Sequence, residues 1–209
     1  MPVTAKICGL STPETLDAAI AGGASHVGFV FFPPSPRNVG FDQARALIDR
    51  VPPHVGTVGV FVDPDEALLG AALATGIQAA QLHKTAPDRA AAIRARVPVW
   101  AAVAVKTRAD LDQAAGYRGA ADRILYDAKT PDSAALPGGM GLRFDWKLLE
   151  SLPQPLPWAL SGGLDAGNVR EAVGTTQAKL VDISSGVERA PGVKDVAKIA
   201  AFLQAVAQC

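Results

Sequence analysis

Side chains able to move protons stand at the ends of several short apolar segments of this chain. Cys8 ends the first such segment, Asp127 lies near the end of another, and His83 ends a third. Thiols, carboxyls and imidazoles are the groups that give and take protons in acid–base catalysis. A lone cysteine is more often an inert core residue. The chemistry of Cys8 therefore depends on whether the fold brings these segment ends together.

Eight apolar segments rich in branched side chains recur along the chain, each followed by a stretch with helical spacing. These segments predict strands at 5–8, 26–31, 56–62, 77–83, 97–105, 122–128, 156–162 and 179–186. Helices are expected to begin near Thr12, Asp42, Pro64, Pro87, Arg108, Asp145, Asp165 and Val193. Strand–helix alternation predicts an all-parallel sheet, because parallel neighbours need a crossover. Strands that are apolar on both faces fit a sheet covered by helices.

Eight such units in 209 residues favour an α/β fold with one domain over 1–209, a (β/α)8 TIM barrel with eight parallel strands. A doubly wound open sheet is the competing architecture, and it usually has fewer strands at this length. The longest irregular stretch, 129–144, is rich in Gly and Pro, and a loop of that length is usually functional or mobile.

Composition argues against several classes of protein. The formal net charge is zero, which removes the main reason to expect a nucleic acid or an anionic membrane as partner. No window approaches the roughly 18 to 20 apolar residues of a membrane span, and the N-terminus lacks a signal-peptide pattern. The only cysteines are Cys8 and Cys209, so a disulfide scaffold is not expected. We expect a cytoplasmic protein.

In a parallel barrel the carboxyl ends of all strands meet on one rim, where active sites are built. The predicted strands therefore bring Cys8, Arg37, His83, Asp127 and Asp182 to the same rim. This gathering of reactive groups is what a small-molecule site requires. Asp182 could equally be an interior carboxylate that is hydrogen-bonded for structural reasons, and His83 could be a buried structural histidine.

Glycines end the last two predicted strands. Gly162 and Gly163 follow strand seven, and Ser185 and Gly186 follow strand eight. Without a Cβ, a glycine lets backbone N–H groups approach an anion closely. The loops after strands seven and eight, with a short extra helix that "SSGVE" could form, are the usual phosphate site of such barrels. We expect a phosphate group there.

In order along the chain, "KICGL", "GFVFFPPSPRNV", "VGVFVD", "QLHK", "LYDA", "GGMGLRFDW", "LSGGLDAGNV" and "VDISSGVERAPGVKD" resemble the motifs of the phosphoribosylanthranilate isomerases. The resemblance covers essentially the whole chain. It implies an eight-stranded barrel that catalyses an Amadori rearrangement in tryptophan biosynthesis. The aldose N-(5′-phosphoribosyl)anthranilate would become the ketose 1-(2-carboxyphenylamino)-1-deoxyribulose 5-phosphate.

The resemblance also implies roles for individual residues. Cys8 would be the general base and Asp127 the general acid. Arg37 would pair with the anthranilate carboxylate, a task that suits a planar guanidinium. Asp182 would contact the anthranilate amino group or orient the substrate, and His83 would line the pocket. Neither a metal nor an organic cofactor is expected, because proton transfers alone carry this chemistry.

Two physical demands follow from these roles. A thiolate base needs a lowered pKa, which a nearby cation such as Lys6 or the surroundings of the bound substrate would provide. A carboxyl acid must keep its proton near neutral pH, which burial or a neighbouring negative charge would arrange for Asp127. The sequence leaves undecided whether Lys6 faces the barrel interior or the site.

One position departs from the family pattern, because Met140 stands where the family usually has threonine. A methionine cannot replace the hydrogen bonds of a threonine hydroxyl, so it would act as an apolar filler.

Three alternatives remain from the sequence. The histidine-pathway aminoaldose phosphate isomerase shares the chemistry but uses an aspartate in place of Cys8. A metal-dependent barrel hydrolase would use Cys8, His83, Asp127 and Asp182, although three histidines are few for a metal site. A phosphosugar-binding module would need no acid–base pair. The expected partner is a small phosphoribosyl substrate, with the protein acting as a monomer or homodimer.

Overall fold

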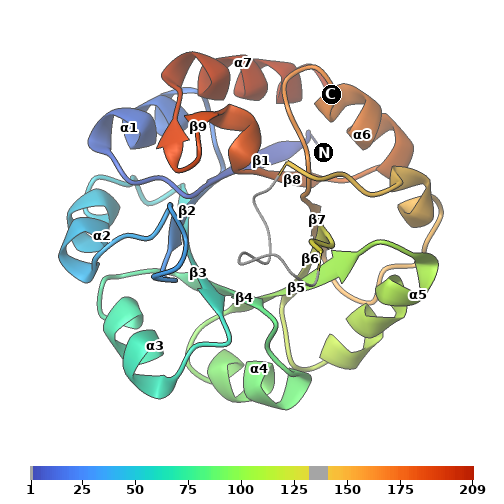
Figure 1. Cartoon of the computed structure of the whole chain (residues 1–209), viewed down its shortest axis with the longest axis horizontal. Coiled ribbons are helices and arrows are strands. Elements are labelled where there is room, and N and C mark those ends of the chain that lie inside the picture. The colour runs from blue at the N-terminus through green and yellow to red at the C-terminus, as the bar shows by residue number, and fades with distance from the viewer. Residues whose placement is uncertain (1, 132–140) are drawn as a thin grey trace.

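The computed structural model describes residues 2–131 and 141–209, and within them eight parallel strands close into a barrel in chain order (Figure 1). The strands are β1 (Thr4–Cys8), β2 (His26–Val30), β3 (Gly56–Val62), β4 (Ala79–His83), β5 (Val99–Val105), β6 (Arg123–Ala128), β7 (Trp158–Leu160) and β8 (Leu180–Ile183). β8 pairs with β1 and completes the ring. The predicted (β/α)8 barrel is confirmed.

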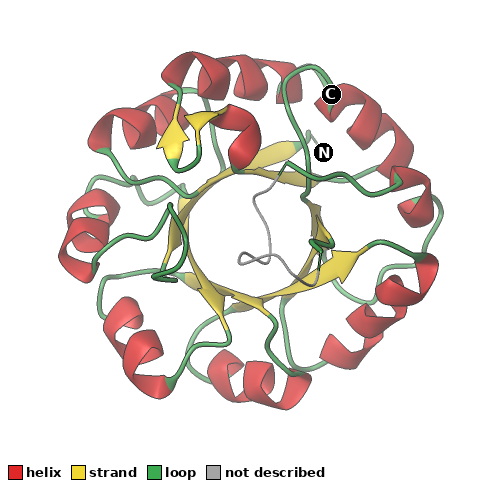
Figure 2. Cartoon of the chain, viewed as in Figure 1, coloured by secondary structure: helices red, strands yellow, loops and turns green. Residues whose placement is uncertain are grey.

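Helices surround the barrel on its outer side (Figure 2). They are α1 (Pro13–Ala21), α2 (Phe41–Ile48), α3 (Glu66–Leu73), α4 (Pro87–Arg94), α5 (Arg108–Leu111), α6 (Val169–Thr176) and α7 (Val196–Val206), with 3-10 turns η1 (Asp112–Tyr117), η2 (Trp146–Leu149) and η3 (Ser185–Val187). Side-chain caps fix several starts: Thr12 accepts a hydrogen bond from Thr15 N, and Asp65 accepts one from Leu68 N.

Three predicted helix starts are corrected by the structure. Val193 does not begin the last helix, because Val193–Lys194 forms the short strand β10, which pairs with β9 (Glu188–Ala190). The helix α7 begins only after Asp195, whose carboxylate accepts a hydrogen bond from Lys198 N. The stretch after Asp145 is a single 3-10 turn, and the turn at Asp165 precedes α6 by several residues.

Successive side chains of a strand point to opposite faces of the sheet, so one set of buried side chains faces the helices and the other faces the barrel axis. Ile7 of β1 belongs to the large apolar core that includes the buried faces of the helices. Toward the barrel axis, a second apolar cluster lies near the amino ends of the strands and consists of Val58, Ala79, Trp100, Leu125, Ala159 and Leu180. We call this cluster the floor layer. Polar inward residues lie beyond it, toward the carboxyl ends of the strands.

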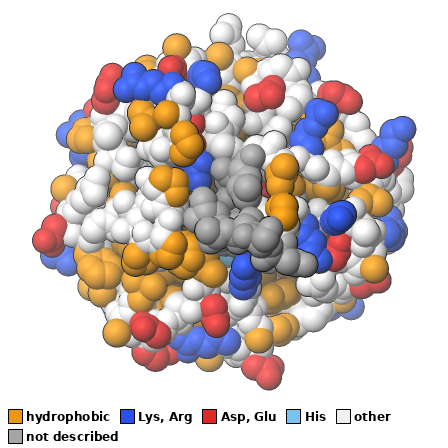
Figure 3. Space-filling view, in the orientation of Figure 1, with side chains coloured by type: hydrophobic (Ala, Val, Ile, Leu, Met, Phe, Trp, Pro, Cys, Tyr) orange, Lys and Arg blue, Asp and Glu red, His pale blue; other side chains and the backbone are white. Residues whose placement is uncertain are grey.

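The surface carries side chains of both charge signs around the rim (Figure 3). Among the described residues, no helix is both long enough and apolar enough to cross a bilayer. The position of Met140 and most of the loop predicted at 129–144 lie outside the described residues.

Candidate active site

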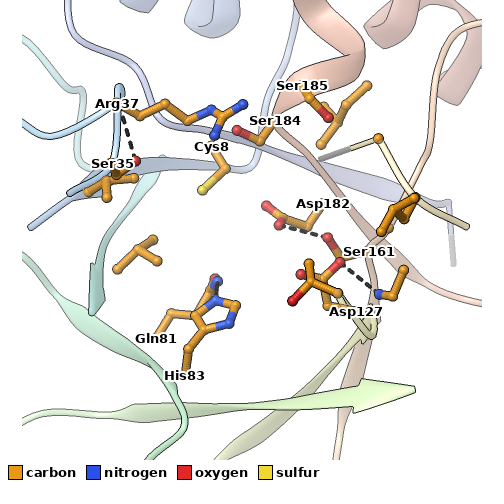
Figure 4. Close-up of a pocket in the computed structure, with 18 of the residues that line it drawn as sticks. Cys8, Ser35, Arg37, Gln81, His83, Asp127, Ser161, Asp182, Ser184 and Ser185 are labelled. Carbon is orange, nitrogen blue, oxygen red and sulfur yellow. Dashed lines mark hydrogen bonds between the residues drawn. The ribbon is translucent and has the colours of Figure 1, made fainter. Parts of the chain in front are cut away.

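A cavity opens at the carboxyl ends of the strands, which is where the active sites of such barrels are built. Its lining includes every site residue predicted from the sequence: Cys8, Arg37, His83, Asp127, Gly162, Gly163, Asp182, Ser185 and Gly186. Figure 4 shows the polar members projecting into one space from different strands. The structure therefore brings all of the predicted residues together.

Cys8 ends β1 with its thiol beside the ammonium group of Lys6. A Cβ on Gly28 of β2 would lie 3.0 Å from Cys8 Sγ and 3.1 Å from Lys6 Nζ, so both groups occupy the space that this glycine leaves. Burial raises the pKa of Cys8 above its ordinary value, although the charge of Lys6 lowers it. The expected lowering by Lys6 is thus present, but desolvation outweighs it.

Asp127 lies near the end of β6, across the pocket from Cys8 (Figure 4). Its carboxylate accepts a hydrogen bond of 2.9 Å from Ala128 N. Burial, reinforced by the negative charge of Asp182, raises the pKa of Asp127 to about 7. The expectation that this carboxyl keeps its proton near neutral pH is confirmed.

Lys6 and Asp182 form a fully buried ion pair that answers the question of where Lys6 points. The two residues are register neighbours on β1 and β8, so they share one face of the sheet. That face is the barrel interior, because Lys6 also reaches β4, a strand that does not neighbour β1. Lys6 Nζ donates to Asp182 Oδ1 at 2.7 Å and to Gln81 Oε1 at 3.0 Å. Burial opposes the charge of Lys6, but Asp182 and Cys8 raise its pKa above the ordinary value. Ser161 Oγ donates to Asp182 Oδ2 at 3.2 Å and completes this network.

His83 ends β4 with its ring against Gln81, where Gln81 Nε2 and His83 Nε2 are 2.9 Å apart. Burial, with a contribution from the positive charge of Lys6, lowers the pKa of His83 to about 4. The imidazole is therefore neutral at physiological pH. It contributes a polar surface to the pocket and no charge.

Arg37 lies in the loop after β2 and is held by Glu188 at the start of β9. Its Nε and Nη2 donate to the two carboxylate oxygens of Glu188 at 2.7 and 2.8 Å. Lys194 Nζ donates to the same carboxylate at 2.7 Å and to the backbone oxygen of Ser184 at 2.9 Å. Among the described residues, two basic side chains thus share one buried carboxylate.

The glycines after β7 adopt conformations that other residues avoid. Gly162 and Gly163 have φ of +91° and +63°. A Cβ on Gly162 would lie 2.7 Å from Ala128 N and 3.2 Å from Asp127 Oδ1, so the turn passes directly against the acidic strand end. The short helix expected in "SSGVE" is present as η3 (Ser185–Val187).

Sequence reasoning missed Gln81, Glu188 and Lys194, each of which fixes a predicted site residue. The signal for Gln81 was its spacing of two from His83 in a predicted strand, which places both on one face. Glu188 and Lys194 carried no comparable signal, because they meet Arg37 only through the β9–β10 hairpin. Among the described residues, no group of three or more His, Cys, Asp or Glu side chains is arranged to hold a metal ion.

A closed (β/α)8 barrel whose cavity gathers a thiol, a carboxyl with a raised pKa and a guanidinium at the carboxyl ends of the strands has the architecture of a barrel enzyme that acts on a small molecule. Comparison with known proteins gives the particular family. The model of the family described as N-(5'phosphoribosyl)anthranilate (PRA) isomerase matches residues 5–205. The chain belongs to this family and is an isomerase.

Individual relatives agree along their whole length. The N-(5'-phosphoribosyl)anthranilate isomerase of Zymomonas mobilis subsp. pomaceae is 55% identical over 99% of both chains, and that of Rhodopseudomonas palustris strain HaA2 is 52% identical over 98% of this chain and 96% of its own. The crystal structure of the Thermotoga maritima isomerase superposes with a TM-score of 0.90 at 37% identity, covering 99% of this chain and 100% of that one. A related isomerase structure in complex with reduced 1-(o-carboxyphenylamino)-1-deoxyribulose 5-phosphate gives 0.86 at 34% identity, with the same coverage.

Proposed function

We propose that this chain converts N-(5′-phosphoribosyl)anthranilate to 1-(2-carboxyphenylamino)-1-deoxyribulose 5-phosphate in tryptophan biosynthesis, with Asp127 as general acid and Cys8 as general base. The observation that carries the assignment is the placement of these two side chains on opposite sides of one cavity (Figure 4). A pKa of about 7 leaves Asp127 able to donate a proton at neutral pH. The complex of a relative with a reduced form of the ketose product supports the same ligand class.

The reaction proceeds through proton transfers at defined atoms, and we assign the first two to Asp127 and Cys8. Asp127 protonates the furanose ring oxygen, the C1′–O bond breaks, and the nitrogen lone pair forms an iminium ion at C1′. The Cys8 thiolate then removes the proton from C2′, and the electron pair moves into an enolamine. In the tautomerisation of the enolamine, the C2′ hydroxyl loses its proton and C1′ gains one, which gives the ketose. No electron acceptor or metal is required, so we infer a reaction without cofactors.

The substrate carries two anionic groups, and two parts of the pocket suit them. Gly162, Gly163, Ser185 and Gly186 line the cavity in the loops after β7 and β8, where barrels of this type usually bind a phosphate group. Arg37 lines the cavity, and a planar guanidinium suits two-point binding of the anthranilate carboxylate. Asp182 lies between these ends, where it would meet the anthranilate nitrogen, and His83 lines the opposite wall.

We also infer that residues 1–209 act as one catalytic domain in the cytoplasm. A monomer or a homodimer fits the known relatives, since the Thermotoga maritima isomerase is described as a dimer from which monomers have been generated. We expect neither nucleic acid nor membrane as a partner, in line with the zero net charge.

The test is turnover of freshly prepared N-(5′-phosphoribosyl)anthranilate, followed as loss of its fluorescence in the presence of EDTA. Wild type should turn over, Cys8→Ser and Asp127→Asn should lose at least about a hundredfold in kcat, and Cys209→Ser is the matched thiol control. Turnover that disappears with EDTA would point to a metal enzyme. No turnover by wild type would reject the function, and the histidine-pathway substrate would be tried next.

A further inference from the structure

Three buried side chains form a hydrogen-bonded series that leads from the ion pair in the barrel interior to the wall of the pocket. It runs from Lys6 on β1 to Gln81 and then His83, both on β4, and the two joining distances are 3.0 and 2.9 Å. Lys6 is fully buried, Gln81 is 2% exposed and His83 is 9% exposed. Figure 4 shows the Gln81 amide against one edge of the His83 ring, while the other edge of the ring faces the pocket.

The donors and acceptors in this chain have one consistent arrangement. A charged lysine has three N–H donors and no acceptor, so the Gln81 atom that meets Lys6 must be the carbonyl oxygen Oε1. The amide nitrogen Nε2 of Gln81 therefore faces His83, and an amide nitrogen can only donate. The Nε2 atom of His83 must accept this bond with its lone pair. In a neutral imidazole the proton then resides on Nδ1.

We propose that Lys6 and Gln81 are positioning residues that hold His83 as the neutral Nδ1–H tautomer, so that this wall of the pocket offers a hydrogen-bond donor to an oxygen atom of the bound substrate. The substrate contact rests on the proposed function, whereas the tautomer does not. We call the hydrogen-bonded series Lys6–Gln81–His83 the relay. Because the relay begins at the Lys6–Asp182 pair, the charge of Lys6 also decides which nitrogen of His83 carries the proton.

Two further observations support the arrangement. Among the described residues, no side chain or backbone group forms a hydrogen bond with His83 Nδ1. That proton is thus available to a ligand, as the ring lines the cavity. The low pKa of His83, about 4, agrees with a ring whose Nε2 lone pair is engaged as an acceptor and whose charged form is disfavoured by burial.

The experiment is a long-range ¹H–¹⁵N correlation spectrum of the ¹⁵N-labelled protein, which distinguishes the two neutral imidazole tautomers. The chain has three histidines, and the His83 signals are the set that disappears in His83→Asn. We expect the Nδ1–H pattern for His83, unchanged from pH 6 to pH 9. An Nε2–H pattern, or an imidazolium pattern at pH 7, in wild type would overturn the proposal without any variant.

Gln81→Leu tests whether the relay is the cause. Removing the amide should let the Nε2–H tautomer appear. The control Gln78→Leu removes a glutamine just before β4, whose Oε1 accepts a hydrogen bond from Thr57 N, and it should leave His83 unchanged. A pure Nδ1–H pattern in Gln81→Leu would show that the relay does not hold the tautomer. We expect about a tenfold rise in KM for Gln81→Leu with kcat nearly unchanged, since a binding contact is lost.

The two proposals fail in different ways. If wild type turns over the proposed substrate but His83 is Nε2–H, the relay is wrong and the function stands. If His83 is Nδ1–H and responds to Gln81→Leu but no turnover occurs, the function is wrong and the tautomer assignment stands. If KM is the same in Gln81→Leu and wild type, His83 does not donate to the substrate.

Discussion

The Lys6–Asp182 ion pair offers a sharp test of the electrostatics of the barrel, because the chain also contains an exposed pair of similar geometry. Lys6 Nζ and Asp182 Oδ1 are 2.7 Å apart with side chains 0% and 5% exposed. Arg50 Nη2 and Asp17 Oδ2 are 2.6 Å apart with side chains 47% and 53% exposed. The substitutions Lys6→Met and Arg50→Met each remove one cation of such a pair, so burial is the main difference between them.

The expected losses of stability differ severalfold. Removing one partner of a buried pair leaves an uncompensated charge and costs about 3–5 kcal/mol, whereas an exposed pair contributes about 0–1 kcal/mol. With a total stability of roughly 5–15 kcal/mol, Lys6→Met should lose a large share of the free energy of unfolding. At about 2–4 °C per kcal/mol for a chain of this size, Tm should fall by roughly 6 to 20 °C. Arg50→Met should stay within about 4 °C of wild type.

Urea denaturation followed by circular dichroism measures both losses, with the slope m checked for two-state behaviour. The double variant Lys6→Met/Asp182→Leu should recover part of the stability, because no buried charge then lacks a partner. Equal losses for Lys6→Met and Arg50→Met would refute the reasoning. So would a double variant less stable than Lys6→Met alone.

Three further predictions concern the site. The active form of the enzyme has protonated Asp127 and a Cys8 thiolate, and Asp127 has the lower pKa of the two. The value of kcat/KM should therefore rise about tenfold per pH unit up to about pH 7, stay level, and fall only above the pKa of Cys8. In Asp127→Asn the residual rate should instead keep rising beyond pH 8, and a wild-type rate that does the same would contradict the assignment. Gly162→Ala should lower the free energy of unfolding by about 1–3 kcal/mol in urea denaturation and should lower kcat. The control Gly23→Ala has a similar φ of +87° and open space around it, so it should lose less stability and keep its kcat. Equal effects of the two substitutions would argue against crowding at Asp127. Iodoacetamide at pH 7.5 should label the exposed Cys209 before the buried Cys8, as read by mass spectrometry, and faster labelling of Cys8 would show that its thiol is not held protonated.

The barrel itself could be predicted from sequence because its determinants are local. Each strand is a short apolar segment and each crossover carries helical spacing, and these patterns require no knowledge of distant contacts. The failure at Val193 has a physical cause as well: Val193–Lys194 pairs with residues 188–190, and Asp195, two residues later, supplies the cap of α7. A hairpin of two or three residues per strand leaves almost no periodicity to detect.

The site could be predicted as a set of residues, but its internal bonding could not. Cys8 and Asp127 were placed on one rim by strand ends alone. The inward orientation of Lys6 followed only once β8 paired with β1 and set Asp182 beside it. The raised pKa of Cys8 was missed for a related reason, since a neighbouring cation is visible in the sequence while the extent of desolvation is not.

The floor layer has a consequence for how molecules reach the site. The barrel is filled near the amino ends of its strands by Val58, Ala79, Trp100, Leu125, Ala159 and Leu180, so the part of the chain that the structure describes leaves no passage through it. Whatever enters and whatever leaves must use the same opening at the carboxyl ends. A product molecule still in place would block the next substrate, so we expect the product to act as a competitive inhibitor. The flux through such an enzyme depends on how quickly the following step of metabolism removes what it makes.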